Sequence, residues 1–178
     1  DEKYIVNGTF SRDGSSRFGP KNRFGNFGAV GVAWLFEKES FIKDNLGFLS
    51  YGKLRASYGT VGNDQIGDYE YYDGWGPSSY PYAGSPTLGP SRFSIPTYRW
   101  EVNNKFEVGL ELGVLKDRIL MTAAYYRNKT SNMLIEYPLS AQSGFPSYVA
   151  NLPAELENKG FELELTTVNV NNRDFKWN

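Results

Sequence analysis

Apolar and polar residues alternate with a period of two along much of this chain. The clearest run covers residues 104–114, where every even position from Phe106 to Val114 is apolar and the odd positions from Lys105 to Gly113 are Lys, Glu or Gly. An α-helix, with its period of about 3.6 residues, would scatter these apolar residues around its circumference, whereas a strand places them on one face. The run therefore predicts a strand with one apolar face and one mixed polar face.

Other segments repeat this pattern. A second clear run occupies residues 160–168, and weaker alternation predicts strands at 4–11, 24–36, 51–62 and 119–127. Most of these segments hold roughly 9–13 residues, which exceeds the typical strand of about 5–6 and suits the roughly 9–11 that a tilted strand needs to cross a bilayer. A water-filled or plugged lumen tolerates the mixed polar face, but the packed centre of a small sandwich does not. The segments favour a membrane-spanning sheet.

The connections between these strands differ in length. They cover residues 12–23, 37–50, 63–98, 116–118, 128–159 and 169–174. From the third onward, long and short connections alternate, as the extracellular loops and periplasmic turns of bacterial outer-membrane barrels do. Structureless loops of about 30 residues are uncommon in compact soluble domains. Residues 37–43 interrupt the pattern and predict a short amphipathic helix at the periplasmic rim.

Aromatic residues are frequent near the predicted strand ends. Tyr125, Tyr126 and Tyr137 fall near one end, and Phe175 and Trp177 near the other. Such residues form the girdles that flank a lipid belt, although Tyr and Phe also favour strands in general. The sequence leaves both explanations open.

Composition removes several classes of function. The net charge of −1, from 19 Lys and Arg against 20 Asp and Glu, provides no basic surface for nucleic acid. The chain has no Cys and no His, so it lacks thiolate chemistry and the commonest general base and metal ligand. No apolar run approaches the roughly 18 residues of a transmembrane helix. The chain starts at Asp1 without an initiator Met, and we expect it to be a piece of a longer protein.

Five sequence stretches carry a resemblance to a known family. In chain order they are SRDGSSRFGP at 11–20, LRASYGTVGN at 54–63, WE at 100–101 followed by Asn104 and GL at 109–110, AYY at 124–126, and NKGFE at 158–162. Together they resemble motifs of the SusC/RagA family of TonB-linked outer-membrane transporters, over residues 4–178. The resemblance implies an all-β fold, an antiparallel transmembrane β-barrel of roughly 22 strands that encloses a plug. Residues 1–178 would be one partial barrel domain with about seven of those strands, without the plug and the remaining strands.

The same resemblance implies a function and a location. The location is the bacterial outer membrane, crossed many times by the barrel. The function is energy-coupled import of oligosaccharides or oligopeptides, with a SusD-like surface lipoprotein as a lid and TonB acting through the absent plug. Outer-membrane lipid would surround the barrel. No enzyme activity and no cofactor are implied.

One family motif has a local interpretation. Residues 12–14 (Arg-Asp-Gly) predict a hairpin tip with positive φ at Gly14. Arg12, Asp13 and Arg17 are expected to cross-link the surrounding loop through ion pairs, which give little stability when exposed.

The connection 63–98 is the candidate functional segment. Aromatic faces stack on sugar rings or hold peptide side chains, and nearby carboxylates orient a ligand through hydrogen bonds. Three interpretations stay open: contact with substrate, contact with the lipoprotein lid, or packing within the loop. The candidate residues are Asp64, Asp68, Tyr69, Tyr71, Tyr72, Asp73, Trp75 and Tyr80.

Other kinds of site are less favoured. The carboxylates of the connection 63–98 lack the spacing of an EF-hand loop, so no metal site is predicted. Glu162 and Glu164 lie on one strand face, whereas glycosidase carboxylates flank the scissile bond from two sides. The alternative to a transporter is a soluble carbohydrate-binding β-sandwich with an aromatic loop platform, which should have shorter strands and tight turns at both ends.

Overall fold

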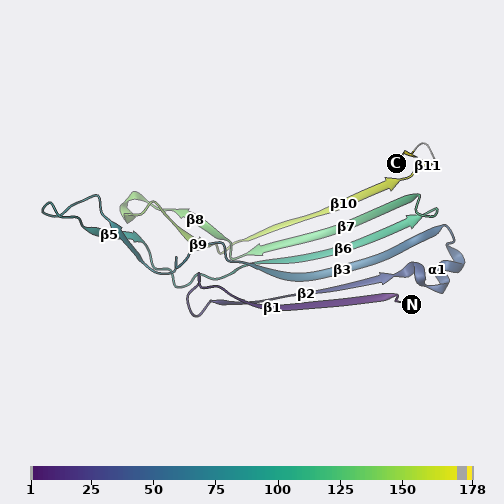
Figure 1. The fold of residues 1–178 in the computed structure, drawn as a ribbon, viewed down its shortest axis with the longest axis horizontal. Helices are drawn as coiled ribbons and strands as arrows, with labels where there is room; N and C mark the ends of the chain where they lie inside the picture. The colour runs from purple at the N-terminus through teal and green to yellow at the C-terminus, as the bar shows by residue number, and fades with distance from the viewer. Residues whose placement is uncertain (1, 172–175, 178) are drawn as a thin grey trace.

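The computed structural model describes residues 2–171 and 176–177, and its main feature is one long antiparallel sheet. The strands of this sheet, in chain order, are β1 (Tyr4–Gly14), β2 (Phe24–Leu35), β3 (Leu49–Asn63), β6 (Glu101–Val114), β7 (Ile119–Ser131) and β10 (Glu155–Thr167). Each strand pairs with its neighbours in this order, and the sheet curves gently along its length (Figure 1). β1 and β10 are its two edges, so the described residues form an open sheet. The predicted all-β antiparallel fold is confirmed.

The two ends of the sheet carry different connections. At one end, two hairpins project beyond the long strands (Figure 1): β4 (Gly74–Pro77) pairs with β5 (Leu88–Arg92), and β8 (Leu134–Pro138) pairs with β9 (Ser147–Asn151). We call this the hairpin end. A 3-10 turn, η2 (Ala141–Ser143), lies between β8 and β9. The predicted long connections are therefore confirmed at one end, although each contains a hairpin.

The opposite end, the turn end, has a tight turn between β6 and β7 and a longer helical connection, residues 36–48, between β2 and β3. The turn between β6 and β7 covers residues 115–118, and Leu115, Lys116 and Asp117 in it have positive φ. The helical segment predicted at 37–43 is confirmed as a 3-10 turn, η1 (Phe36–Lys38), followed by α1 (Ser40–Asn45). Within the described part of the chain, no helix has the length and apolar character needed to cross a membrane.

The seventh expected strand lies largely beyond the described residues. Phe175, where it was predicted to begin, is outside them, as is part of the connection 169–174. Its remaining portion is β12 (Lys176–Trp177), which pairs with β11 (Val170–Asn171) in a separate two-stranded ladder.

β7 and β10 continue past their predicted ends toward the hairpin end, so the connection is shorter than the predicted 128–159. The side chains that break the alternation there are charged and pair across the two strands. Arg127 Nε lies 2.9 Å from Glu157 Oε2, and Lys129 Nζ lies 2.7 Å from Glu155 Oε2. Because ion pairs replace apolar residues, the strands continue after the apolar pattern has stopped.

The hairpin tip predicted at 12–14 is wrong. Gly14 lies within β1, pairs with Phe24 of β2, and does not adopt a positive φ. A Cβ at Gly14 would lie 2.9 Å from the Phe24 ring, so the glycine makes room for that ring rather than for a turn. Arg12 also contacts this ring, with its guanidinium carbon 4.9 Å from the ring centroid.

The sheet has one apolar face and one polar face. Ladder partners share a face, as Leu54 and Leu110 do on the apolar side and Lys53 and Glu111 on the polar side. The polar face is described with the site. The apolar face has no covering layer among the described residues; Leu163, for example, is 72% exposed. Large exposed residues of the apolar face are Tyr4, Val6, Phe10, Val30, Val32, Leu54, Tyr58, Phe106, Phe161, Leu163 and Leu165.

A compact apolar cluster lies in the connections at the hairpin end, outside the long sheet. It consists of Phe18, Ile66, Tyr71 and Tyr98, and we call it the loop core. Phe18 is fully buried. The described chain thus combines a two-faced sheet with a small hydrophobic core built from its loops.

Candidate functional site

The centre of the polar face is an ion-pair network around Arg55 of β3. Its guanidinium pairs with Glu107 and, from Nε to Oε1 at 3.1 Å, with Glu111, both on β6. Lys53 Nζ also lies 3.3 Å from Glu111 Oε1. Gly109, the ladder partner of Arg55, leaves space for the guanidinium. The network links neighbouring strands across a face that carries both signs of charge.

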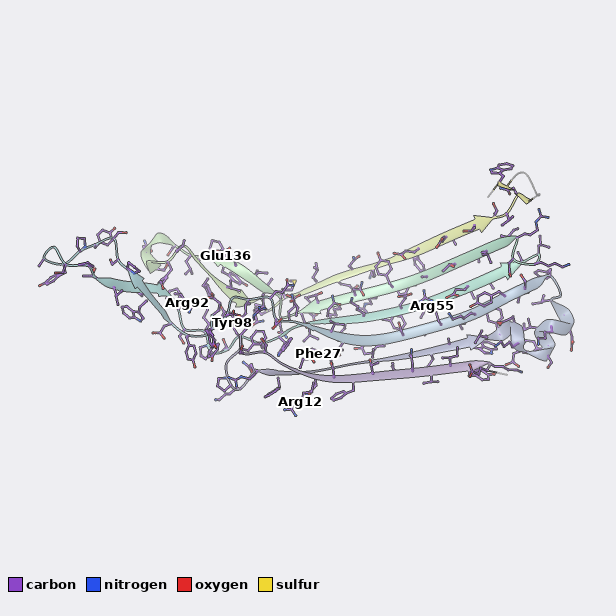
Figure 2. All side chains as sticks on the ribbon, in the orientation of Figure 1. Arg12, Phe27, Arg55, Arg92, Tyr98 and Glu136 are labelled. Carbon is purple, nitrogen blue, oxygen red and sulfur yellow. The ribbon has the colours of Figure 1, made fainter. Side chains whose placement is uncertain are left out.

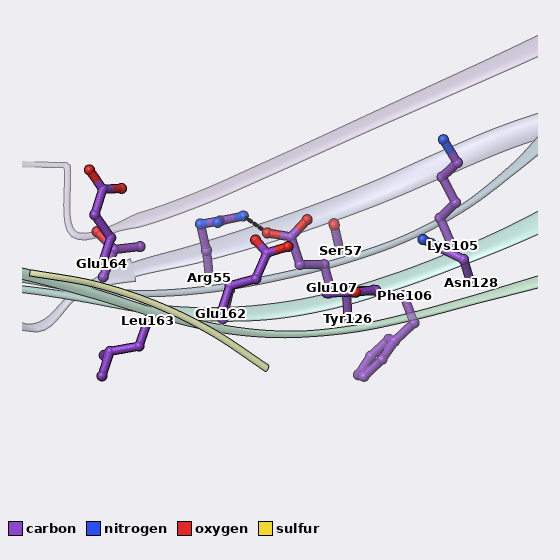
Figure 3. A pocket seen from close by; sticks show the side chains of 12 residues that line it. Arg55, Ser57, Lys105, Phe106, Glu107, Tyr126, Asn128, Glu162, Leu163 and Glu164 are labelled. Atoms are coloured by element: carbon purple, nitrogen blue, oxygen red, sulfur yellow. Dashed lines mark ion pairs between the residues drawn. The ribbon is translucent and has the colours of Figure 1, made fainter. Parts of the chain in front are cut away.

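A hollow of about 750 Å³ opens on this face beside the network. Figure 3 shows Arg55, Glu107 and Glu162 on one side of the sheet, while Phe106 and Leu163 extend to the other side. The charged side chains that line the hollow include three carboxylates and two cations. A mixed charged wall of this kind favours contact with water over contact with lipid.

The two family motifs that contain Phe18 and Trp100 meet at the hairpin end. Their ring centroids are 5.4 Å apart, and the Trp100 ring also lies 5.3 Å from Phe27 of β2 in an edge arrangement. Trp100 Nε1 donates a hydrogen bond to the Arg23 carbonyl oxygen at 3.2 Å. Phe27 fits because Gly62 has no Cβ to collide with its ring. Trp100 therefore joins the loop core to the long sheet.

Arg17 forms ion pairs with two of the candidate carboxylates. Arg17 Nε lies 3.0 Å from Asp68 Oδ1, and Arg17 Nη1 lies 3.8 Å from Asp64 Oδ1. Ser15 Oγ also donates to Asp64 Oδ2 at 2.7 Å. Of the three residues expected to form loop ion pairs, Arg17 does so, with partners from the connection 63–98. Arg12 instead contacts the Phe24 ring, and Asp13 accepts a hydrogen bond from Ser11 Oγ at 3.0 Å.

The candidate aromatic residues occupy two different environments. Tyr71 is buried in the loop core, and the neighbouring Tyr69 and Tyr72 are about half exposed. Trp75, at 63% exposure, and Tyr80, at 84%, belong to the β4–β5 hairpin. The structure therefore separates the candidates into a group next to the loop core and a projecting aromatic group.

Asp73 belongs with the projecting group. Its carboxylate accepts a hydrogen bond from Trp75 Nε1 at 3.2 Å. This contact ties the start of the β4–β5 hairpin together and orients the indole ring. Sequence reasoning placed both residues in one functional loop but did not anticipate their contact.

A cleft of about 410 Å³, which we call the loop cleft, lies between the two long connections. Glu70, Arg92 and Tyr98 come from the connection before β6, and Glu136 and Tyr148 from the connection after β7. Arg92, Tyr98 and Glu136 are close together at the hairpin end (Figure 2). Arg92 Nη1 lies 3.1 Å from Glu70 Oε1. The cleft thus has cationic, anionic and aromatic groups within one concave surface.

Sequence reasoning missed these cleft residues apart from Glu70, which it weighed only among the carboxylates of a possible calcium site. They are single charged or aromatic positions in segments without periodicity, and the two segments meet only after folding. Tyr148 stacks on Tyr137 at 5.7 Å and approaches Phe93 at 6.4 Å, so aromatic packing shapes the wall. The sequence signal available was the high aromatic content of both connections.

Tyr98 fixes the base of the loop cleft. It is 2% exposed, and its hydroxyl donates a hydrogen bond to the Val149 carbonyl oxygen. Burial, with further contributions from the nearby Glu70 carboxylate and Tyr148, raises the pKa of Tyr98 to about 12. The side chain therefore remains a neutral donor at ordinary pH and holds the two long connections together.

The carboxylates considered as calcium ligands have other partners. Asp64 and Asp68 pair with Arg17, Glu70 with Arg92, and Asp73 with Trp75. The described residues contain no group of three or more acidic side chains arranged to hold a metal ion. The geometry of these carboxylates fits loop organisation.

Known proteins match this chain along its whole length. The family model described as TonB dependent receptor-like, beta-barrel, matches residues 1–178. TonB-dependent receptor P3 of Formosa agariphila is 35% identical over 178 residues, which cover 98% of this chain and 18% of that protein. TonB-dependent receptor SusC of Bacteroides thetaiotaomicron is 30% identical over 182 residues, with 98% and 18% covered.

Solved structures agree with these sequence matches. The RagAB peptide importer in its closed-closed state superposes with a TM-score of 0.89 at 30% identity, covering 99% of this chain and 19% of that chain. This chain spans less than a fifth of the length of the relatives it matches. From the full-length family match, the meander of long strands and this superposition, we conclude that the chain belongs to the β-barrel family of TonB-dependent receptors.

Proposed function

We propose that this chain forms part of the barrel wall and extracellular mouth of a TonB-dependent outer-membrane importer. The observation that carries the proposal is the two-faced sheet, apolar and uncovered on one side and charged on the other. In a barrel the apolar face contacts lipid and the polar face lines the interior. The remaining strands and the plug belong to other parts of the complete protein.

The hairpin end is the extracellular end in this proposal. Bacterial outer-membrane barrels have long extracellular loops and short periplasmic turns, and the two longest described connections, residues 64–100 and 132–154, both lie at the hairpin end. The turn between β6 and β7, with Lys116 at its centre, would then face the periplasm. The loop core would hold the extracellular connections in a defined arrangement.

The substrate class is oligosaccharides or oligopeptides. One relative of this chain is named SusC and another is a peptide importer, and both are 30% identical to it. Exposed Trp75 and Tyr80 provide faces for sugar rings or peptide side chains, and the loop cleft adds paired charges. A SusD-like lipoprotein would cover this mouth, and TonB would act through the plug. The proposal includes no catalytic step and no cofactor.

Within the candidate loop, the residues have different roles. Asp64, Asp68 and Tyr71 hold the loop in place through Arg17 and the loop core. Contact with substrate or lid falls to the exposed candidates that these contacts do not engage, which are Tyr69, Tyr72, Asp73, Trp75 and Tyr80.

Import can be tested with the complete gene and that of its lipoprotein partner. A deletion strain should lose growth on the oligosaccharide or oligopeptide that supports the parent, and the complete gene should restore it. A Trp75→Ala/Tyr80→Ala variant should restore growth poorly at limiting substrate. The matched control is Phe41→Ala, because Phe41 is exposed on α1 at the opposite end. Equal growth of deletion and parent strains on every such substrate would contradict the proposal.

The orientation of the two faces can be tested by spin labelling. The chain has no Cys, so a single introduced cysteine is unique within this segment. A label at Leu163 should be accessible to oxygen dissolved in lipid, whereas a label at Thr122 on the polar face should be accessible to a water-soluble nickel complex. The reverse accessibilities, or water access at both positions, would favour the soluble carbohydrate-binding alternative.

A further inference from the structure

A band of cations lies on the apolar side of the sheet near the hairpin end. The ladder places Arg127 of β7 beside Phe106 of β6, and Lys129 beside Asn104. These cations therefore project from the same face as the exposed apolar residues, one step closer to the long connections. We call Arg127, Lys129 and Lys159 the basic rim.

A shallow cleft of about 450 Å³, the rim cleft, lies within this band. It is lined by Tyr58, Asn104, Phe106, Arg127 and Lys129. These residues supply two cations, one phenol, one amide and one apolar ring, and none is acidic. The cleft shares only Phe106 with the hollow of the polar face and no residue with the loop cleft.

The carboxylates near the rim do not fully balance its cations. Glu157 is shared between Arg127 and Lys159, whose Nζ lies 3.1 Å from Glu157 Oε1. Glu155 pairs with Lys129. Both acids belong to β10, which lies on the other side of β7 from β6, so the rim cleft is lined by the two cations and by no carboxylate. The side chain of Arg127 remains 52% exposed.

The apolar face continues directly from the rim cleft. Tyr58 and Phe106 are ladder partners and belong to both surfaces, and the Leu54–Leu110 pair follows further from the hairpin end. A ligand that fits this arrangement has an anionic head and long apolar chains. Arginine suits a phosphate because its planar donors can bind two oxygens at once, and lysine adds a point charge.

We propose that the rim cleft binds the phosphate-bearing headgroup of an anionic lipid in the outer leaflet of the membrane. The acyl chains of this lipid lie along the apolar face below Phe106. This inference rests on the proposed function, because it requires the apolar face to contact lipid and the hairpin end to be extracellular. It assigns the Arg127 and Lys129 side chains a ligand that is distinct from the imported substrate.

The test uses the complete transporter in vesicles of phosphatidylethanolamine with a minor fraction of a monophosphorylated lipid A. The amount of phosphorylated lipid that remains bound after detergent extraction is measured by mass spectrometry. Arg127→Gln/Lys129→Gln should reduce this retention by roughly five-fold for each cation removed, as expected for cations near an anionic surface. The matched control is Lys43→Gln/Lys116→Gln, which removes two cations from the turn end and should leave retention unchanged.

A second variant reverses the expected direction. Glu155→Gln/Glu157→Gln removes the acids that compete for the rim cations and should increase retention. Inorganic phosphate added at the same concentration should fail to displace the lipid, because it has no chains to place on the apolar face. Displacement would mean a simple anion site and would overturn the lipid assignment.

The outcomes separate this inference from the proposed function. Unchanged retention in Arg127→Gln/Lys129→Gln, with normal insertion and import, overturns the rim cleft as a lipid site and leaves the importer proposal standing. Failure of the wild-type protein to insert into vesicles overturns both. Loss of lipid retention supports the inference if the unheated variant still migrates on a gel as a folded barrel. A misfolded variant would lose both the lipid and the folded band.

Discussion

Gly109 lies directly opposite Arg55 in the β3–β6 ladder, and the absent side chain leaves the space that the guanidinium occupies. A Cβ at Gly109 would lie 2.9 Å from Arg55 Nε and 3.0 Å from its Cζ. The glycine therefore allows Arg55 to lie across the polar face and reach Glu107 and Glu111. One small residue thus determines the arrangement of an ion-pair network that spans two strands.

Gly109→Val should displace Arg55 and lower the free energy of unfolding by about 1–3 kcal/mol, as overpacked sites do. The measurement is urea unfolding of the complete protein in vesicles. Gly47→Ala is the control, because a Cβ there meets nothing within 4 Å. In an Arg55→Ala background the Gly109→Val effect should shrink, and an undiminished effect would show that Arg55 is not the residue displaced.

Leu163→Arg should destabilise the protein in a bilayer by about 2–4 kcal/mol, because it places a cation on the lipid side. Thr122→Arg on the polar face should cost much less, since the added cation faces an aqueous interior lined with carboxylates. Both are measured as urea transitions in vesicles. Equal costs at the two positions would remove the distinction between the faces.

Phe18→Ala should loosen the long connections while leaving the long sheet intact. Removing a fully buried Phe typically costs about 3–5 kcal/mol. The expected result is faster cleavage of the connection 63–98 by an added protease, with unchanged β-sheet circular dichroism. Arg17→Gln, which breaks partly exposed ion pairs, should produce a much smaller change. Proteolysis at the wild-type rate in Phe18→Ala would show that the loop core is not what orders the connections.

Alkaline pH should weaken the contact between the two long connections through Tyr98. The pKa of Tyr98 is raised from 10.0 to about 12 in the folded protein, so between these values the folded state keeps a proton that the unfolded state has lost. The stabilising contribution is therefore complete below pH 10 and falls as the pH rises toward 12. The difference in tyrosinate absorbance between wild type and Tyr98→Phe should titrate near the upper value. A titration near the ordinary tyrosine pKa would contradict the raised pKa of Tyr98.

The alternation of residues predicted the strands of the sheet correctly but not their full lengths. The alternation predicts a strand correctly where an apolar residue such as Leu110 or Leu163 lies on one face and the next residue, which is charged, lies on the other. It fails from Arg127 onward, because charged residues take the positions of apolar ones on that face and continue the ladder through cross-strand ion pairs. Gly14 was misjudged because a glycine beside an aromatic ring and a glycine in a turn look the same in sequence.

The loop core and the loop cleft were beyond sequence reasoning for a different reason. Phe18 lies in a segment that reads as polar, and Tyr98 in a connection without periodicity. Their burial depends on contacts between segments far apart in the chain, such as the hydrogen bond from Asn22 Nδ2 to the Tyr98 carbonyl oxygen at 2.9 Å. Composition identified the right connection, 63–98, but not which of its residues point outward.

The loop core also has a consequence for how such a protein diversifies. Because Phe18 and Tyr98 give the connections a buried centre of their own, their arrangement does not rest on the long sheet alone. Exposed positions on the β4–β5 hairpin can then change residue without disturbing this buried cluster, which in the proposed importer would let the substrate change while the barrel stays the same.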